Sequence, residues 1–152
     1  MKLLIDADAL PNMIKEILFR ASERKGLPAV FVANVPIRVP KTSLMSFILA
    51  KSGPDEADHL IAEMTEAGDL CITNDIPLAA RVAEKGGTSI NHRGEVIDRG
   101  NASEKLAMRN LMETLRGMDE VRGGPKPFSE RDRREFANAL DRILSRLPNR
   151  SV

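Results

Sequence analysis

The chain of 152 residues has no tryptophan, no tyrosine and a single cysteine, Cys71. A lone cysteine cannot form an internal disulfide, and Cys71 stands in the apolar run LCIT, so we expect it to pack as a small hydrophobic residue. The only aromatic residues are five phenylalanines, most of which stand in apolar stripes. Because little aromatic surface is left for stacking on bases, a sequence-specific RNA reader is not expected.

Long hydrophobic runs and a large net charge are also missing. No stretch approaches the roughly 18 apolar residues of a membrane-spanning helix, and the N-terminal apolar run stops at Asp6, too early for a signal peptide. We therefore expect a cytoplasmic protein with no membrane partner. The net charge of +1 gives no signature of a nucleic-acid binder. The charge is unevenly divided, with 11 basic and 14 acidic residues in 1–98 and 12 basic and 8 acidic residues in 99–152.

The apolar residues alternate between short continuous runs and helical stripes, which is typical of a chain of alternating strands and helices. The expected strands are 3–5, 29–34, 70–73 and 88–90, and the expected helices run from Pro11 to near Gly26, from Pro54 to Gly68, and over 78–83 before Gly86. Segment 41–50 fits either a short helix or an edge strand. Short apolar strands joined by helices predict an α/β fold, with a parallel sheet covered by helices on both faces.

Two further helices are expected over 101–118 and 129–147, joined by RGGPKP at 122–127. The length fits one domain, so we expect residues 1–152 to form a single unit with both helices packed on the same core. The linker fits a plain connection better than a mobile lid over a site. The methionine stripe of Met108, Met112 and Met118 indicates core or an interface, which leaves a homodimer open.

Aspartates follow the ends of the expected strands. Asp6 and Asp8 come directly after 3–5, and Asp75 follows 70–73, so all three belong to the carboxyl edge of the sheet, where such folds bind ligands. Asp55 and Asp58 lie three residues apart in the first turns of a helix and share one of its faces. Each acid, taken singly, can also cap a helix or complement its N-terminus.

If these acids converge, the repulsion between their negative charges has to be compensated. Two carboxylates about 4 Å apart repel by roughly 4 kcal/mol at an effective dielectric constant of 20, so a cluster needs protons or a cation. Carboxylates without histidine or cysteine partners suit Mg²⁺ or Mn²⁺, and such sites commonly serve phosphoryl transfer with a water molecule activated by the metal.

Five motifs along nearly the whole chain resemble, in order, those of the YaiI/YqxD family of bacterial proteins. They are DADALP at 6–11, PDEADHLI at 54–61, GDLCITNDIPLA at 68–79, NHRGEV at 91–96, and GGP at 123–125 with FSERDRREF at 128–136. Leu10 stands where the family usually has cysteine, and His92 where it usually has proline. Neither departure replaces one of the acidic residues. The missing cysteine at position 10 argues against a mechanism that uses a thiol there.

The family is similar to PIN-type domains, which implies a Rossmann-like three-layer α/β/α fold and a Mg²⁺- or Mn²⁺-dependent ribonuclease acting on RNA. The resemblance implies Asp6, Asp58 and Asp75 as catalytic acids that hold one or two metal ions. Asp8 and Asp55 become further ligands, direct or through water. Thr73 and Asn74 are implied to line the same turn and contact substrate.

Basic residues in loops beside strand ends are candidates for phosphate contact, although most surface lysines and arginines are only solvated. Arg93 is the best of them, followed by Arg38, Lys41 and Arg109. Of the histidines, His59 points away from Asp58 and is expected on the surface. His92, in the loop before Arg93, is placed to reach substrate, although a lone histidine in a loop is more often simply exposed.

Two alternatives remain. A haloacid-dehalogenase-like phosphatase also presents strand-DxD acids, but Asp69 precedes its strand and would lie at the amino edge, opposite the site. The other alternative is a PIN-like scaffold that binds RNA or a protein without cutting, for which the basic second part of the chain could follow phosphates.

Overall fold

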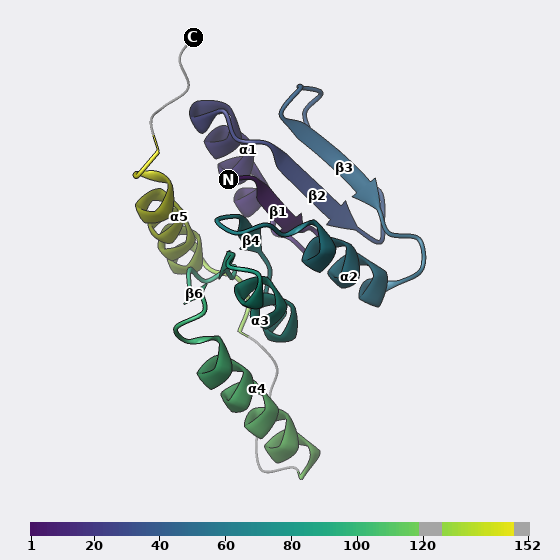
Figure 1. The fold of residues 1–152 in the computed structure, drawn as a ribbon, viewed down its shortest axis with the longest axis vertical. Coiled ribbons are helices and arrows are strands. Elements are labelled where there is room, and N and C mark those ends of the chain that lie inside the picture. Colours follow the sequence, from purple (N-terminus) through teal and green to yellow (C-terminus); the bar gives the residue numbers. More distant parts are fainter. Residues whose placement is uncertain (119–125, 148–152) are drawn as a thin grey trace.

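The computed structural model describes residues 1–118 and 126–147. Within these residues six strands form one sheet in the order β3-β2-β1-β4-β5-β6 (Figure 1). The strands are β1 (Leu3–Asp6), β2 (Ala29–Ala33), β3 (Met45–Leu49), β4 (Leu70–Ile72), β5 (Thr88–Ile90) and β6 (Val96–Ile97). The first five are parallel, and β6 pairs antiparallel with β5. The α/β prediction with a mostly parallel sheet is therefore confirmed.

The described helices cover both faces of this sheet. They are α1 (Asn12–Lys25), α2 (Pro54–Met64), α3 (Ile76–Glu84), α4 (Ala102–Gly117) and α5 (Glu130–Leu144). Alternation along each strand separates the two faces. Leu3 and Ile5 of β1 face a core shared with α1 and α5, whereas Leu4 faces a second core shared with α2 and α3. The result is a three-layer arrangement with β1 buried at its centre.

Two local features were not decided or not expected from the sequence. Segment 41–50 contains the edge strand β3, which pairs in parallel with β2, so the strand alternative is confirmed. Strand β6 was not predicted because it is only two residues long and its pairing depends on the turn at Asn91–Glu95. Most of the RGGPKP linker at 122–127 lies outside the described residues.

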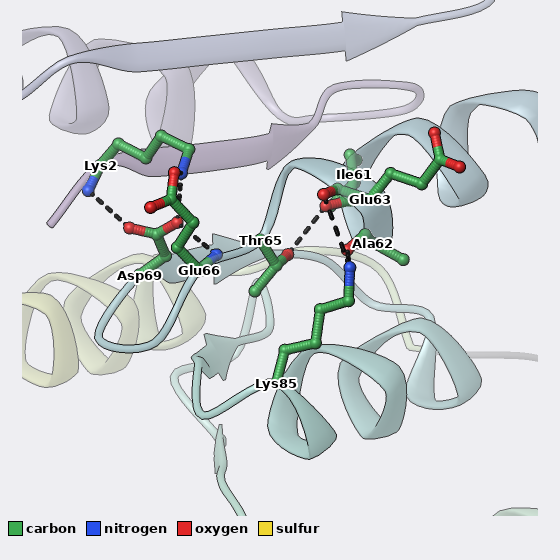
Figure 2. A network of polar contacts seen from close by, with 8 residues as sticks. All are labelled: Lys2, Ile61, Ala62, Glu63, Thr65, Glu66, Asp69 and Lys85. Atoms are coloured by element: carbon green, nitrogen blue, oxygen red, sulfur yellow. Dashed lines mark hydrogen bonds and ion pairs between the residues drawn. The ribbon is translucent and has the colours of Figure 1, made fainter.

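The amino edge of the sheet carries a network that holds Asp69 in a structural role (Figure 2). The Asp69 carboxylate accepts hydrogen bonds from the backbone N–H and the Nζ of Lys2, at 3.0 and 2.5 Å, and from the N–H of Glu66 at 2.8 Å. The bonds from Lys2 and Glu66 hold the pKa of Asp69 below its usual value, against the opposing effect of its burial. Asp69 therefore ties the residue before β1 to the start of β4, at the edge opposite Asp6 and Asp75. A phosphatase site would need Asp69 at the same edge as Asp6.

Helix α4 differs from the other helices in how little it buries. It packs against α3 and projects beyond the rest of the fold (Figure 1). Ala102 is its one buried residue, while Met108, Leu111 and Met118 are 52–63% exposed. The core alternative for the methionine stripe is therefore wrong for Met108 and Met118, and the interface alternative stays a prediction. None of the described helices is long and apolar enough to cross a membrane.

Candidate active site

The registers of the parallel strands determine which side chains meet at the carboxyl edge. Ile5 of β1 lies opposite Ile72 of β4, so the next residues, Asp6 and Thr73, leave the sheet side by side. The buried Thr73 hydroxyl donates a hydrogen bond to Asp6 Oδ2 at 2.8 Å and accepts one from the N–H of Asp75 at 3.0 Å. A single hydroxyl group therefore connects the acid after β1 to the acid that follows β4.

Asp75 is held by the start of α3. It is the N-cap residue of this helix, and its Oδ1 accepts a hydrogen bond from the N–H of Leu78 at 2.9 Å. Pro77 in the first turn fits a helix start, because its missing N–H would have no intrahelical partner there. The expectation that Asp75 caps a helix is thus confirmed. The cap uses only Oδ1, so Oδ2 takes no part in it.

Asp58 reaches this site from α2, where the charges of Asp75 and Asp6 act on its carboxyl group. Burial, the largest cause, and the negative charges of Asp75, Asp6 and Asp55 together raise the pKa of Asp58 to about 7. Burial also raises the pKa of Asp6, helped by Asp8 and Asp75 and opposed by the hydrogen bond from Thr73. The structure therefore brings together Asp6, Asp58 and Asp75, the three residues expected to be catalytic.

Asp8 lies beside this group but is engaged differently. Asp6 pairs with Val32 in the register of β1 and β2, so Asp8 meets Asn34, two residues further on each strand. The Asp8 carboxylate accepts hydrogen bonds from the backbone N–H of Asn34, at 2.9 and 3.1 Å, and from its side-chain amide. Asp8 thus joins the end of β1 to the end of β2 through hydrogen bonds. Asn34 was not singled out from the sequence, although a polar residue directly after a buried strand was the available signal.

The turn after Asp8 is strained. Ala9 has φ 58°, in the left-handed region that residues with a Cβ seldom occupy. Such strain is held in place by the surrounding structure and is common at functional sites.

Asp55, the fifth predicted ligand, is exposed in the first turn of α2, and its charge acts on Asp58.

Asn74 is fixed by His92, again through the strand register. Ile72 of β4 lies opposite Ile90 of β5, and the residues two positions later bond to each other. Asn74 Oδ1 accepts a hydrogen bond from the N–H of His92 at 2.8 Å, and Asn74 Nδ2 lies 3.0 Å from His92 Nδ1. Because an amide nitrogen only donates, Nδ1 is the acceptor and the imidazole proton is on Nε2. His92 orients Asn74 at the rim of the site.

The expectation that His92 is exposed is wrong. The residue is 8% exposed, and burial lowers the pKa of its imidazole to about 4, with a smaller contribution from the charge of Arg93. The burial of a loop residue depends on tertiary packing, which short-range sequence patterns do not reveal. His59, by contrast, is exposed on α2 and pairs with Glu63 at 3.0 Å, as expected for a surface residue.

The predicted phosphate-binding residues separate into two groups. Arg93 lines a cavity together with Thr73, Asn74 and Asp75, but its guanidinium also donates to the carbonyl of Lys126 and lies 3.4 Å from Asp132 Oδ2. Arg93 is thereby held against the start of α5.

Arg38, Lys41 and Arg109 are not among the residues that line this cavity. Lys41 follows Pro40, which lies with Arg20 and Arg24 around a cavity at the end of α1, near the start of β3. The β2–β3 loop has to return along the sheet because both strands are parallel, and it carries Lys41 toward the amino edge. Arg109 lies on α4 and pairs with Glu113 at 2.8 Å.

The donor set suits a hard cation. The converging groups are carboxylate, hydroxyl and amide oxygens, which Mg²⁺ and Mn²⁺ prefer. Within residues 1–118 and 126–147, no three side chains of the His, Cys, Asp and Glu types lie close enough to hold one ion by themselves. Mg²⁺ usually keeps several water ligands and takes only one or two carboxylates from the protein, so Asp58 and Asp75, whose charges act on each other, fit such an ion.

Comparison with known proteins gives a consistent result over the whole chain. Residues 4–146 match the family described as "Uncharacterized BCR, YaiI/YqxD family". A "UPF0178 protein" of Trichlorobacter lovleyi is 50% identical over 97% of this chain and 96% of its own length. Proteins of the same description are 47% identical in Sulfurimonas denitrificans and 51% identical in Shewanella baltica, each over 96% of this chain and 97% of the relative. No solved structure matches the chain.

Proposed function

The chain belongs to the YaiI/YqxD family, and from this premise and the geometry of its carboxyl edge we propose that it is a Mg²⁺- or Mn²⁺-dependent nuclease that hydrolyses phosphodiester bonds in RNA. One observation carries the proposal: the Thr73 hydroxyl bonds both Asp6 and the N–H of Asp75, and the charges of these two acids act on Asp58, at the carboxyl edge of β1 and β4, between which the strand order reverses. Open parallel sheets bind ligands at this position. The resemblance to PIN-type domains favours RNA as the substrate.

Asp58 and Asp75 would hold a divalent ion directly, and Asp6 would act through the water ligands of that ion or on a second ion, with Asp8 and Asp55 as outer partners. A divalent ion supplies Lewis acidity toward the phosphodiester and lowers the pKa of water. Asp8 is less suited to direct contact, because Asn34 already occupies its carboxylate through three hydrogen bonds. It keeps the turn around the site in place.

The protein's own groups prepare the site before any ion enters. Thr73 fixes the orientation of Asp6 and of the turn that carries Asp75. The pKa of Asp58 near 7 means that, without an ion, its carboxyl group keeps a proton up to about neutral pH. That proton has to leave before two carboxylates can take a cation, so metal binding should release a proton and weaken below pH 7.

The test is cleavage of a labelled single-stranded RNA with Mn²⁺ or Mg²⁺ by the wild type, Asp6→Asn and Asp75→Asn. Both variants should lose activity by about a hundredfold or more, because the charge that holds the ion is removed. Asparagine is chosen because it is as good an N-cap as aspartate, so Asp75→Asn should keep α3. Asp141→Asn, on the exposed side of α5, is the matched control.

Cleavage at the wild-type rate by both variants would remove the mechanism. A wild type that cuts no RNA with either ion would favour the scaffold that binds without cutting.

A further inference from the structure

A cavity of about 420 Å³ opens beside Asp75, the one of the three acids that lines it. The turn after β4 contributes Thr73, Asn74 and Asp75 to its lining. Three cations, Arg93, Lys105 and Arg116, also line it, together with the carboxylate of Glu95. An anion seated in this cavity would therefore lie between the acid after β4 and a group of positive charges.

Two of these cations come from α4, the helix that buries little of its own surface. Lys105 and Arg116 are eleven residues apart, three helical turns, so they lie on one face of α4 and about 16 Å apart along its axis. Lys105 makes only a weak contact with Glu95, at 3.4 Å and largely exposed. Arg116 forms no ion pair with any residue of the described part of the chain. Among residues 1–118 and 126–147, Lys105 therefore has one exposed ion-pair partner and Arg116 has none.

The size and chemistry of the cavity fit one nucleotide. Its volume falls in the range of small-ligand pockets, roughly 300 to 1,000 Å³, and is too small for a duplex. Ile76 and Ile97 give it an apolar surface for a base, and Asn91 adds an amide group. Because no aromatic ring of the described residues lines it, base stacking is weak and little preference among bases is expected.

We propose that this cavity holds one nucleotide of a single-stranded RNA next to the bond that lies at the acidic edge, with Lys105 and Arg116 contacting its phosphates. The position of that bond rests on the proposed nuclease function, whereas binding in the cavity does not. A paired strand cannot place its nucleotide in the cavity, so single strands are the ligand and duplexes are excluded.

The test is binding without cleavage. Fluorescence anisotropy of a labelled ten-nucleotide RNA, in EDTA, is measured for the wild type and for the double variant Lys105→Gln with Arg116→Gln. The matched control is Arg20→Gln with Arg142→Gln, two exposed arginines on α1 and α5 that remove the same charge. We expect the Lys105/Arg116 variant to bind at least tenfold more weakly. Its slope of log K against log salt should fall by about 1.4, near 0.7 for each lost phosphate contact.

The same RNA in duplex form should bind the wild type at least tenfold more weakly than the single strand, and the Lys105/Arg116 variant should bind that duplex as the wild type does. Equal loss of single-strand binding in the Lys105/Arg116 variant and in the control, or a duplex that binds as well as the single strand, overturns the proposal. If the wild type cuts no RNA but the Lys105/Arg116 variant selectively loses binding, only the nuclease function fails.

Discussion

Replacing Asp58 by asparagine is expected to stabilise the metal-free protein at neutral and alkaline pH. The pKa of Asp58 is about 7 in the folded protein, against an ordinary value of 3.8. Between these values the native state binds a proton that the unfolded state has released, so the free energy of unfolding falls as the pH rises from about 4 to 7. Asparagine, which does not ionise, removes this dependence.

The full shift would correspond to about 4 kcal/mol. Asp58 is partly exposed, and solvent screening reduces the expected gain at pH 8 to about 1 to 2 kcal/mol. At pH 4, where the native Asp58 is protonated, the variant and the wild type should have nearly equal stability. The stabilisation therefore has to grow with pH across the interval set by the two pKa values.

Urea denaturation in EDTA at pH 4, 5, 6, 7 and 8 measures this difference. Asp141→Asn serves as the control, since its exposed contact with Arg24 should be worth about 0 to 1 kcal/mol and should not change between pH 6 and 8. Adding Mn²⁺ at ten times its dissociation constant should stabilise the wild type by about 1.4 kcal/mol and the variant by much less. If the free energies of unfolding of the wild type and Asp58→Asn change with pH in the same way, the raised pKa of Asp58 is refuted.

Two further predictions concern the backbone around the site. Ala9→Gly should raise the free energy of unfolding by about 0.5 to 1 kcal/mol, because relief of the left-handed strain exceeds the added entropy of glycine in the unfolded chain; a decrease in urea denaturation would contradict this. Gly94→Ala should lower it by about 2 to 4 kcal/mol, because φ is 84° and a Cβ would lie 2.5 Å from the carbonyl oxygen of Glu135. Gly117→Ala on α4, where nothing lies within 4 Å, is its control and should cost nothing in the same measurement.

Much of the fold was predictable because its strands and helices have strong local patterns. The apolar run at 3–5 and the stripe that begins after Pro11 correspond to β1 and α1, and Asp75 was expected as the cap of α3. What sequence patterns left open depends on tertiary neighbours. Segment 41–50 becomes a strand because β2 offers it a free edge, and the two residues of β6 pair only because the preceding turn reverses the chain onto β5.

At the site, too, some residues could be predicted from local patterns and others could not. Placing Asp6 and Asp75 at one edge required only that parallel strands end together, and Asp58 joins them because α2 begins at that edge, soon after the end of β3. The roles of Asn34 and His92 follow from exact strand registers, which alternating apolar residues do not specify to within one position. Lys105 and Arg116 come from a helix whose placement depends on its contact with α3.

The central position of β1 also has a consequence for biosynthesis. Its two neighbours in the sheet are β2 and β4, and Asp75, which completes the acidic group, is translated 69 residues after Asp6. At about 5 to 20 residues per second, this delay is roughly 3 to 14 seconds. A nascent chain therefore carries Asp6 on a strand edge that lacks its β4 neighbour during that time, and the acidic group is complete only when β4 and the start of α3 have left the ribosome.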